Sequence, residues 1–116
     1  MLKPANRLKD KQLFNKILKI GRYQSGQFTV IKFLPQADKL LIGFIVSTKV
    51  SKKAVVRNKI KRRLREIFRL LIKDKKIKTG FEIVVIAKPK AAEAGFKELE
   101  KEINNLMMKS NIKCDS

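Results

Sequence analysis

Hydrophobic residues recur along the chain at helical spacing in three segments, and three other segments are short apolar runs. The first helix is predicted to begin near Asp10, a suitable N-cap, and to end before Gly21, a suitable residue after a helix. Its apolar positions fall on one stripe, at Leu13, Phe14, Ile17 and Leu18. This segment is therefore predicted to pack one face against a core.

The second and longest helix is predicted over residues 54–73, and a third over residues 92–108. Spacings of three and four connect the apolar positions of the second helix, which are Val56, Ile60, Leu64, Ile67, Phe68 and Leu71. The third helix has a similar stripe, formed by Phe96, Leu99, Ile103, Leu106 and Met107. Both helices are predicted to be amphipathic and to cover a sheet.

Three strands complete the predicted fold. Residues 27–34 are rich in β-branched and aromatic side chains, and residues 40–47 are almost continuously apolar. A turn at residues 35–38 predicts that these two strands pair as an antiparallel hairpin. The third strand covers residues 81–87 and ends at Pro89. The order α-β-β-α-β-α is typical of an α+β sandwich, with one domain over residues 1–110 and a polar C-terminal tail over residues 111–116.

Charge separates this chain from ordinary small domains. It has 29 Lys and Arg residues against 10 Asp and Glu, a formal net charge of +19, while 44% of its residues are hydrophobic. The apolar content is sufficient for a folded core, so the chain is not a disordered basic tail. A folded domain with such an excess repels itself unless a polyanion neutralises it, which points to a nucleic acid or an anionic membrane as partner.

Several kinds of chemistry are excluded by what the sequence lacks. It contains no histidine, so neither a Ser-His-Asp arrangement nor a histidine base is possible, and its five glycines form no phosphate-binding loop. Its one cysteine, Cys114, allows no internal disulfide and no cysteine-cluster metal site. No catalytic residue and no metal ligand are therefore predicted on this chain.

A membrane-spanning segment is not predicted either. The longest apolar run covers residues 40–46, far short of the roughly 20 residues that a spanning helix requires. The N-terminus also lacks the apolar stretch of a secretory signal. We expect a cytoplasmic protein.

The basic residues concentrate around the predicted second helix. Between Lys52 and Arg69 there are nine Lys and Arg residues and a single acid, Glu66. At about 100° per residue, four of these basic positions lie with Asn58 on one face, opposite the apolar stripe: Lys61, Arg62, Arg65 and Arg69. A solvated face normally mixes charges, as residues 92–108 do. The asymmetry instead predicts a rigid phosphate-binding ridge, to which the planar fork of arginine is well suited.

The same helix carries a family resemblance. Residues 57–66, Arg-Asn-Lys-Ile-Lys-Arg-Arg-Leu-Arg-Glu, resemble the RNR signature of the bacterial ribonuclease P protein family. The Asn-Arg-Leu at residues 6–8, Phe14, and the segments 43–49 and 82–89 are also similar to that family. The resemblance covers nearly the whole chain, apart from the last few residues.

The resemblance implies a fold and a role. The fold would be the ribosomal protein S5 domain 2-like sandwich, with a left-handed crossover between parallel strands. The chain would be the protein subunit of an endoribonuclease ribonucleoprotein that removes the 5′ leader of precursor tRNA, with catalysis in the ribonuclease P RNA. Mg²⁺ would be held by that RNA, and no small-molecule substrate is expected. RNA contacts would come from the RNR helix, at Lys53, Arg57, Asn58, Lys59, Lys61, Arg62, Arg65 and Arg69.

The resemblance also implies a cleft between the first helix and the sheet that binds the single-stranded leader. The positions expected to line it are Phe14, Leu18, Ile31 and Phe33, with Lys32 nearby. Flat apolar side chains beside cations suit unstacked bases. The alternative is that Phe14 and Leu18 are ordinary core residues.

Three other functions compete with this interpretation. A structural RNA-binding protein of the ribosomal type has a similar composition and charge, and only the signature and the element order disfavour it. A protein-only nuclease needs clustered carboxylates, whereas those of this chain are scattered. An anionic-membrane binder needs the apolar stripe of residues 54–73 to be exposed.

Overall fold

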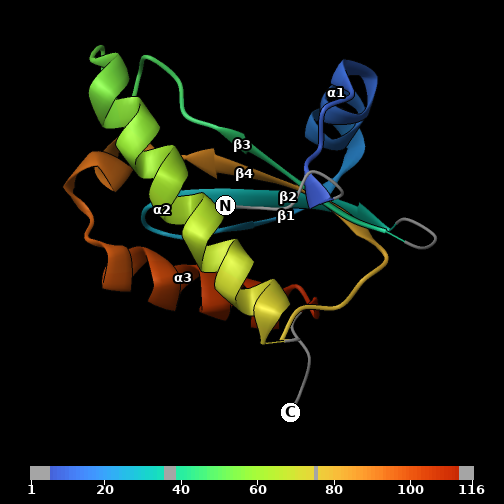
Figure 1. Ribbon diagram of the computed structural model, residues 1–116. Helices are drawn as coiled ribbons and strands as arrows, with labels where there is room; N and C mark the ends of the chain where they lie inside the picture. Colours follow the sequence, from blue (N-terminus) through green and yellow to red (C-terminus); the bar gives the residue numbers. More distant parts are fainter. Residues whose placement is uncertain (1–5, 36–38, 75, 113–116) are drawn as a thin grey trace.

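The fold is a mixed four-stranded sheet with helices on both faces (Figure 1). The computed structural model describes residues 6–35, 39–74 and 76–112. Strands lie side by side in the order β1-β2-β4-β3. Along the chain the elements are α1 (Lys11–Ile20), β1 (Arg22–Ser25), β2 (Thr29–Pro35), β3 (Leu40–Ile45), α2 (Ala54–Lys73), β4 (Phe81–Ala87), the 3₁₀ helix η2 (Pro89–Glu93) and α3 (Phe96–Lys109).

The three helices agree closely with the sequence prediction. The bounds of α2 are those predicted, and α1 begins after Asp10, whose Oδ1 accepts a hydrogen bond of 2.8 Å from Gln12 N. The third helix begins later than predicted. Residues 89–93 form a separate 3₁₀ helix, and Gly95 is the N-cap of α3, with its N–H donated to Glu98 Oε1.

Strand pairing differs from the prediction in two respects. The predicted hairpin between the strands near residues 27–34 and 40–47 is wrong, because β4 lies between β2 and β3. β4 is antiparallel to β2 and parallel to β3. Most of β4 is buried on both faces, which explains its central position, since an edge strand would leave one side open.

The partner of β2 in a hairpin is β1, a strand that the sequence pattern did not reveal. Its four residues, Arg-Tyr-Gln-Ser, are exposed except for the half-buried Gln24. Alternation of apolar and polar residues is therefore absent, although Gly26 marks the turn that follows. The observed order is α-β-β-β-α-β-α, still an α+β sandwich.

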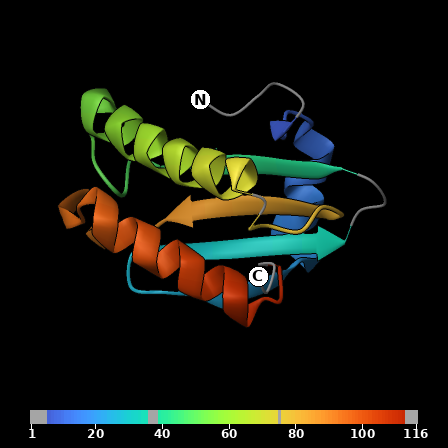
Figure 2. The same cartoon turned by 60° about the horizontal axis from the view of Figure 1, so that its bottom comes forward.

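The connection from β3 through α2 to β4 is left-handed, as the family resemblance implied. In Figure 1, α2 lies in front of the sheet, and β3 and β4 both run from right to left. When this view is turned so that both strands point upward, β4 lies to the left of β3. Parallel strands are usually joined with the opposite hand. The crossover brings α2 alongside α3 on one face of the sheet (Figure 2).

The sheet separates two hydrophobic clusters of different size. The larger one lies between the sheet and the helices α2 and α3, and Phe44 meets Phe68 there edge to face, with ring centroids 5.8 Å apart. The smaller one lies under α1 and includes Ile17 and Val84. The apolar stripe of α2 is buried in the larger cluster, as predicted, through Ile60, Leu64, Ile67, Phe68 and Leu71. An exposed stripe, which membrane binding would require, is therefore not present on α2.

Two segments outside the regular elements are part of the folded domain. Residues 6–8 lie along the outer edge of β3, where Leu8 N donates to Ile42 O at 3.0 Å. At the other end, Ile112 is fully buried, and its carbonyl accepts from Lys78 N at 2.7 Å. The predicted tail therefore does not begin at residue 111, and residues 113–116, with Cys114, lie outside the described residues. No helix in the described ranges is both long and apolar enough to cross a membrane.

Candidate nucleic-acid interface

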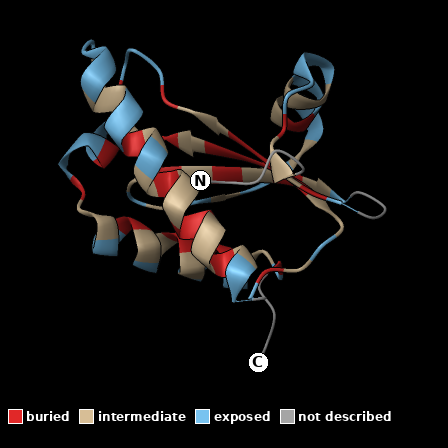
Figure 3. Ribbon diagram, in the orientation of Figure 1, coloured by how far each residue is buried: buried red, intermediate tan, exposed pale blue. Residues whose placement is uncertain are grey.

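The predicted ridge lies on the outward side of α2. In Figure 3 that side of the helix is exposed or half-buried, and the side facing the sheet is buried. Five residues of the basic segment are exposed: Lys52, Lys53, Asn58, Lys59 and Arg62. Four others are half-buried: Arg57, Lys61, Arg65 and Arg69. All eight predicted contact residues thus lie on α2 or at its N-cap, with side chains that solvent reaches.

These cations are almost entirely without acidic partners in the protein. Within the described ranges one ion pair occurs, between Arg69 Nε and Glu66 Oε1 at 2.5 Å. This hydrogen bond lowers the pKa of Glu66 and raises that of Arg69. The other basic residues of α2 have no such acidic neighbour among the described residues. Binding of an external anion would therefore reduce their mutual repulsion.

The N-terminal end of α2 adds to the positive field. Its N-cap is Lys53, which makes no side-chain capping bond, and the first turn contains no acid. A helix N-terminus carries partial positive charge and normally attracts acidic side chains, so this arrangement favours an anionic ligand over an internal partner. Arg57 stabilises the turn before the helix, since its Nη1 donates to Ser51 O at 2.9 Å and to Lys52 O at 3.0 Å.

Arg63 has a structural role. Its Nη1 donates to Ala94 O at 2.8 Å, which ties α2 to the segment before α3. Arg63 is not among the predicted RNA contacts.

A pocket of about 180 Å³ lies beside the ridge, where residues 7–9 and α1 approach β3 and α2. Three cations line it, Arg7, Lys9 and Arg65, together with the rings of Phe14 and Phe44. Its mixture of cations and aromatic rings suits a phosphate joined to an unstacked base. Sequence reasoning did not place Arg7 and Lys9 in the site, although the Asn-Arg-Leu motif at residues 6–8 was the available signal.

The structure brings together only part of the predicted cleft. Phe14 and Leu18 are half-buried on the side of α1 that faces the sheet. Ile31 and Phe33 lie on the opposite face, in the core beneath α2 and α3, with 0% and 6% of their surface exposed. Their assignment to the cleft is wrong, because side chains alternate along a strand.

Lys32 is on the side of β2 that faces α1, as Leu34 is. Its Nζ donates to Leu18 O at 2.9 Å. In the sheet it lies opposite Val84, which in turn lies opposite Gly43, and the ring of Phe14 covers Gly43. On the α1 face, Lys32, Val84 and Gly43 therefore form one row across the strands. The ring of Phe14 lies at the Gly43 end of this row, and the cation Lys32 lies near the other end.

Metal ligands are not grouped in the described part of the chain. No three His, Cys, Asp or Glu side chains come together there in an arrangement that would hold an ion. We assign no metal ligand to these residues.

A mixed sheet domain with a polycationic helix and an adjoining basic, aromatic pocket has the surface of a nucleic-acid-binding protein. The family model "Ribonuclease P" matches residues 2–111. The relatives described below are ribonuclease P protein components. The chain therefore belongs to the ribonuclease P protein family. Its role is that of the protein subunit in tRNA 5′ processing, and its partner is a ribonuclease P RNA.

Relatives and solved structures resemble this chain over most of its length. It is 39% identical to the ribonuclease P protein component of Clostridioides difficile over 90% of this chain and 91% of that protein. The Thermus aquaticus component is longer: identity is 44% over 90% of this chain and 60% of that protein. The Staphylococcus aureus ribonuclease P protein superposes with a TM-score of 0.82, at 27% identity over 93% of this chain and 97% of that one. The Thermotoga maritima ribonuclease P protein superposes with a TM-score of 0.78, at 33% identity over 89% of this chain and 96% of that one.

Proposed function

We propose that the exposed face of α2 binds the ribonuclease P RNA and that the α1 face of the sheet, with the adjoining pocket, binds the 5′ leader of precursor tRNA. Hydrolysis releases the leader and leaves a 5′ phosphate on the mature tRNA. In this proposal Mg²⁺ held by the RNA activates the water and stabilises the leaving oxygen. The protein screens phosphate repulsion between two RNAs and holds the leader, and this takes place in the cytoplasm.

One observation carries the proposal for α2. Lys59, Lys61, Arg62 and Arg65 extend from a rigid helix and have no hydrogen-bonding or ionic partner among the described residues. Side chains held on a helix lose less conformational freedom when they bind than those on a loop. The helix is also fixed from below by its buried stripe, so the cations keep their mutual spacing when RNA approaches.

The case for the leader depends on the pocket and the row beside it. Arg65 belongs both to the ridge and to the pocket that Phe14 lines. A strand leaving the RNA-bound side of α2 would therefore meet Phe14 first. Because α1 covers the row beyond Phe14, where Val84 is fully buried and Lys32 Nζ donates to Leu18 O, the strand would pass along the side of α1 toward Lys32. Exposed rings beside cations bind unpaired RNA with little sequence preference.

Reconstitution tests the proposed role of α2. The triple variant Lys61→Ala, Arg62→Ala, Arg65→Ala is assembled with a ribonuclease P RNA at low Mg²⁺ and assayed on precursor tRNA. The matched control removes three exposed lysines from α3, at Lys97, Lys101 and Lys109. Both variants lose the same net charge, so weaker assembly in the first alone supports a specific surface. Equal affinity in the two variants would move the RNA contact away from α2.

A second experiment tests the leader site. Phe14→Ala is expected to weaken the holoenzyme's binding of precursor tRNA more than its binding of mature tRNA, since only the precursor carries the leader. Equal loss for both RNAs would assign Phe14 to the core alone. Thermal unfolding of the variant, measured in parallel, shows whether the fold has survived.

A further inference from the structure

Tyr23 is an exposed aromatic residue that neither the ridge nor the pocket uses. It lies on β1, the edge strand, with 65% of its surface exposed, and it makes no hydrogen bond with any described residue. A single exposed aromatic side chain is by itself unremarkable in a folded protein. Its position in the sheet register and the cations near it indicate that it contacts a ligand.

The register places Tyr23 at the end of the row described above. Tyr23 lies opposite Lys32 in the antiparallel pair β1–β2, so both side chains are on the face that α1 covers. The complete row across the four strands is Tyr23, Lys32, Val84 and Gly43. Three strand spacings separate its ends, a span of about 14 Å, with Phe14 over one end and Tyr23 at the other.

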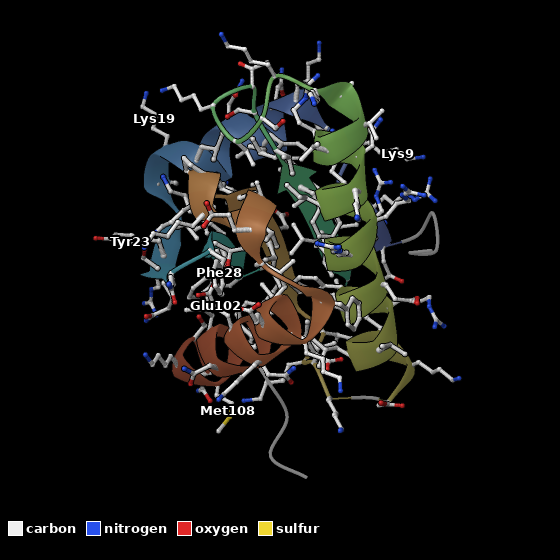
Figure 4. The ribbon with its side chains drawn as sticks, turned by 90° about the vertical axis from the view of Figure 1, so that its left-hand side faces the viewer. Lys9, Lys19, Tyr23, Phe28, Glu102 and Met108 are labelled. Atoms are coloured by element: carbon white, nitrogen blue, oxygen red, sulfur yellow. The ribbon has the colours of Figure 1, made fainter. Side chains whose placement is uncertain are left out.

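Helix α1 follows this row and ends before reaching Tyr23. Phe14 covers Gly43, and Leu18 O accepts from Lys32 one turn later. The helix then ends at Ile20, so Tyr23 is left uncovered beyond it. Figure 4 shows Tyr23 and Lys19 on the same edge of the molecule, with the tyrosine pointing away from the domain.

The chain segment that carries Tyr23 is basic. From residue 11 to residue 35 the sequence contains five Lys and Arg residues and no acid. Lys19, in the last turn of α1, is exposed, and Lys32 lies opposite Tyr23 on the same face of the sheet. A ring beside such cations is suited to a nucleobase whose neighbouring phosphates the cations neutralise.

We infer that Tyr23 is a second base-stacking position on the leader path, farther from the cleavage site than Phe14. The inference rests on the proposed function of the α1 face and extends it to the edge of the sheet. The order of the two positions follows from Arg65, which joins the Phe14 end of the row to the RNA-binding helix. A leader too short to pass along the length of α1 reaches Phe14 and does not reach Tyr23.

Leader length gives the decisive test in the reconstituted holoenzyme. Tyr23→Ala is compared with Tyr23→Phe, which keeps the ring, on precursors with leaders of about two and about ten nucleotides. With the long leader, Tyr23→Ala is expected to weaken binding roughly 5-fold or more, the effect of one lost stacked base. Tyr23→Phe is expected to stay near the wild type, and the short leader is expected to bind all three proteins equally. Met108→Ala, an exposed apolar residue of α3, is the matched control.

A spectroscopic readout locates the contact without activity. Tyr23 is the one tyrosine in the sequence, so protein labelled with 3-fluorotyrosine gives a single ¹⁹F resonance from this position. The resonance of the holoenzyme is expected to shift with the long-leader precursor and to stay in place with mature tRNA.

The outcomes separate this inference from the proposed function. If wild-type holoenzyme prefers precursor over mature tRNA while Tyr23→Ala and the ¹⁹F resonance show no response to the long leader, the role of Tyr23 is wrong and the leader site stands. If wild type shows no preference for a leader at all, both fail together. Equal loss for short and long leaders in Tyr23→Ala also overturns the inference, because it indicates a general structural effect.

Discussion

The ring of Phe14 lies directly against the backbone of Gly43, so closely that a methyl group on Gly43 would overlap the ring. This contact brings α1 close to β3 and places Phe14 at the wall of the pocket that Arg65 lines from the other side. The glycine is required here by the close approach of the ring. Phe14 is thus both a packing residue and a residue with a surface that solvent reaches.

Gly43→Ala is predicted to displace Phe14 without changing its chemistry. The added methyl should cost about 1–3 kcal/mol of unfolding free energy through overpacking, measured by urea denaturation. Binding of precursor tRNA should weaken more than binding of mature tRNA. Gly95→Ala adds the same methyl group where Glu98 is the neighbouring side chain, and it should leave leader recognition unchanged.

A double variant checks that the clash is the cause. Phe14→Leu has a smaller side chain, so combining it with Gly43→Ala should recover part of the lost stability, giving a non-additive cycle. Additive losses in the double variant would contradict the proposed contact. They would indicate that Gly43→Ala destabilises the protein for a reason other than a clash with Phe14.

Arg65 and Arg69 are predicted to contribute unequally to RNA affinity, although both lie on the basic face of α2. Glu66 neutralises part of the charge of Arg69 and lowers the local potential. Arg65→Ala should therefore weaken binding of the ribonuclease P RNA more than Arg69→Ala, and Glu66→Gln should strengthen it. Filter binding at several salt concentrations measures all three variants. A larger loss for Arg69→Ala would show that the RNA displaces Glu66 and recruits Arg69 fully.

The helix assignments succeeded because each helix has a periodic apolar stripe, and one hydrophobic cluster buries each stripe. The bounds of α2 were predictable, since Ile60 and Leu64 repeat at helical spacing and are both buried. Its basic face was also predictable, because the absence of acids is visible in the sequence alone. Which cations serve the fold was not: Arg57 and Arg63 donate to backbone carbonyls that only the folded chain brings near.

Strand order and the cleft depend on long-range pairing, which local pattern does not encode. The four residues of β1 lack apolar alternation, so their pairing with β2 was invisible. Alternation along β2 did separate two faces, but nothing local showed which face α1 covers. Ile31 and Phe33 were therefore placed on the wrong side, whereas Lys32 is hydrogen-bonded to α1.

The affinity for RNA is predicted to depend steeply on salt. If the ridge neutralises about 6–10 phosphates, affinity should fall by roughly 10³–10⁵ between 50 and 200 mM monovalent salt. The variant lacking Lys61, Arg62 and Arg65 should have a slope smaller by about three, one for each lost phosphate contact. The lysine-deficient α3 control should keep the wild-type slope. A flat response in the wild type would contradict a phosphate-binding ridge.

Glu102 of α3 is predicted to hold the β1–β2 turn in place. Its carboxylate accepts from Gln27 N at 2.5 Å, from Phe28 N at 3.0 Å and from Thr29 Oγ1 at 2.7 Å. Removing it leaves two backbone N–H groups at the turn without their acceptor. Glu102→Ala should lower the unfolding free energy by about 2 kcal/mol or more, since hydrogen bonds to a charged group are the stronger ones.

The control for this variant is Glu93→Ala, an exposed acid in η2 whose side chain has no described partner. It removes the same charge and should change stability little. Because the turn positions β1, the ¹⁹F resonance of Tyr23 should broaden or shift in Glu102→Ala even without RNA. Unchanged stability together with an unchanged resonance would show that the sheet register alone holds β1, and that the carboxylate contributes no more than a solvated surface acid.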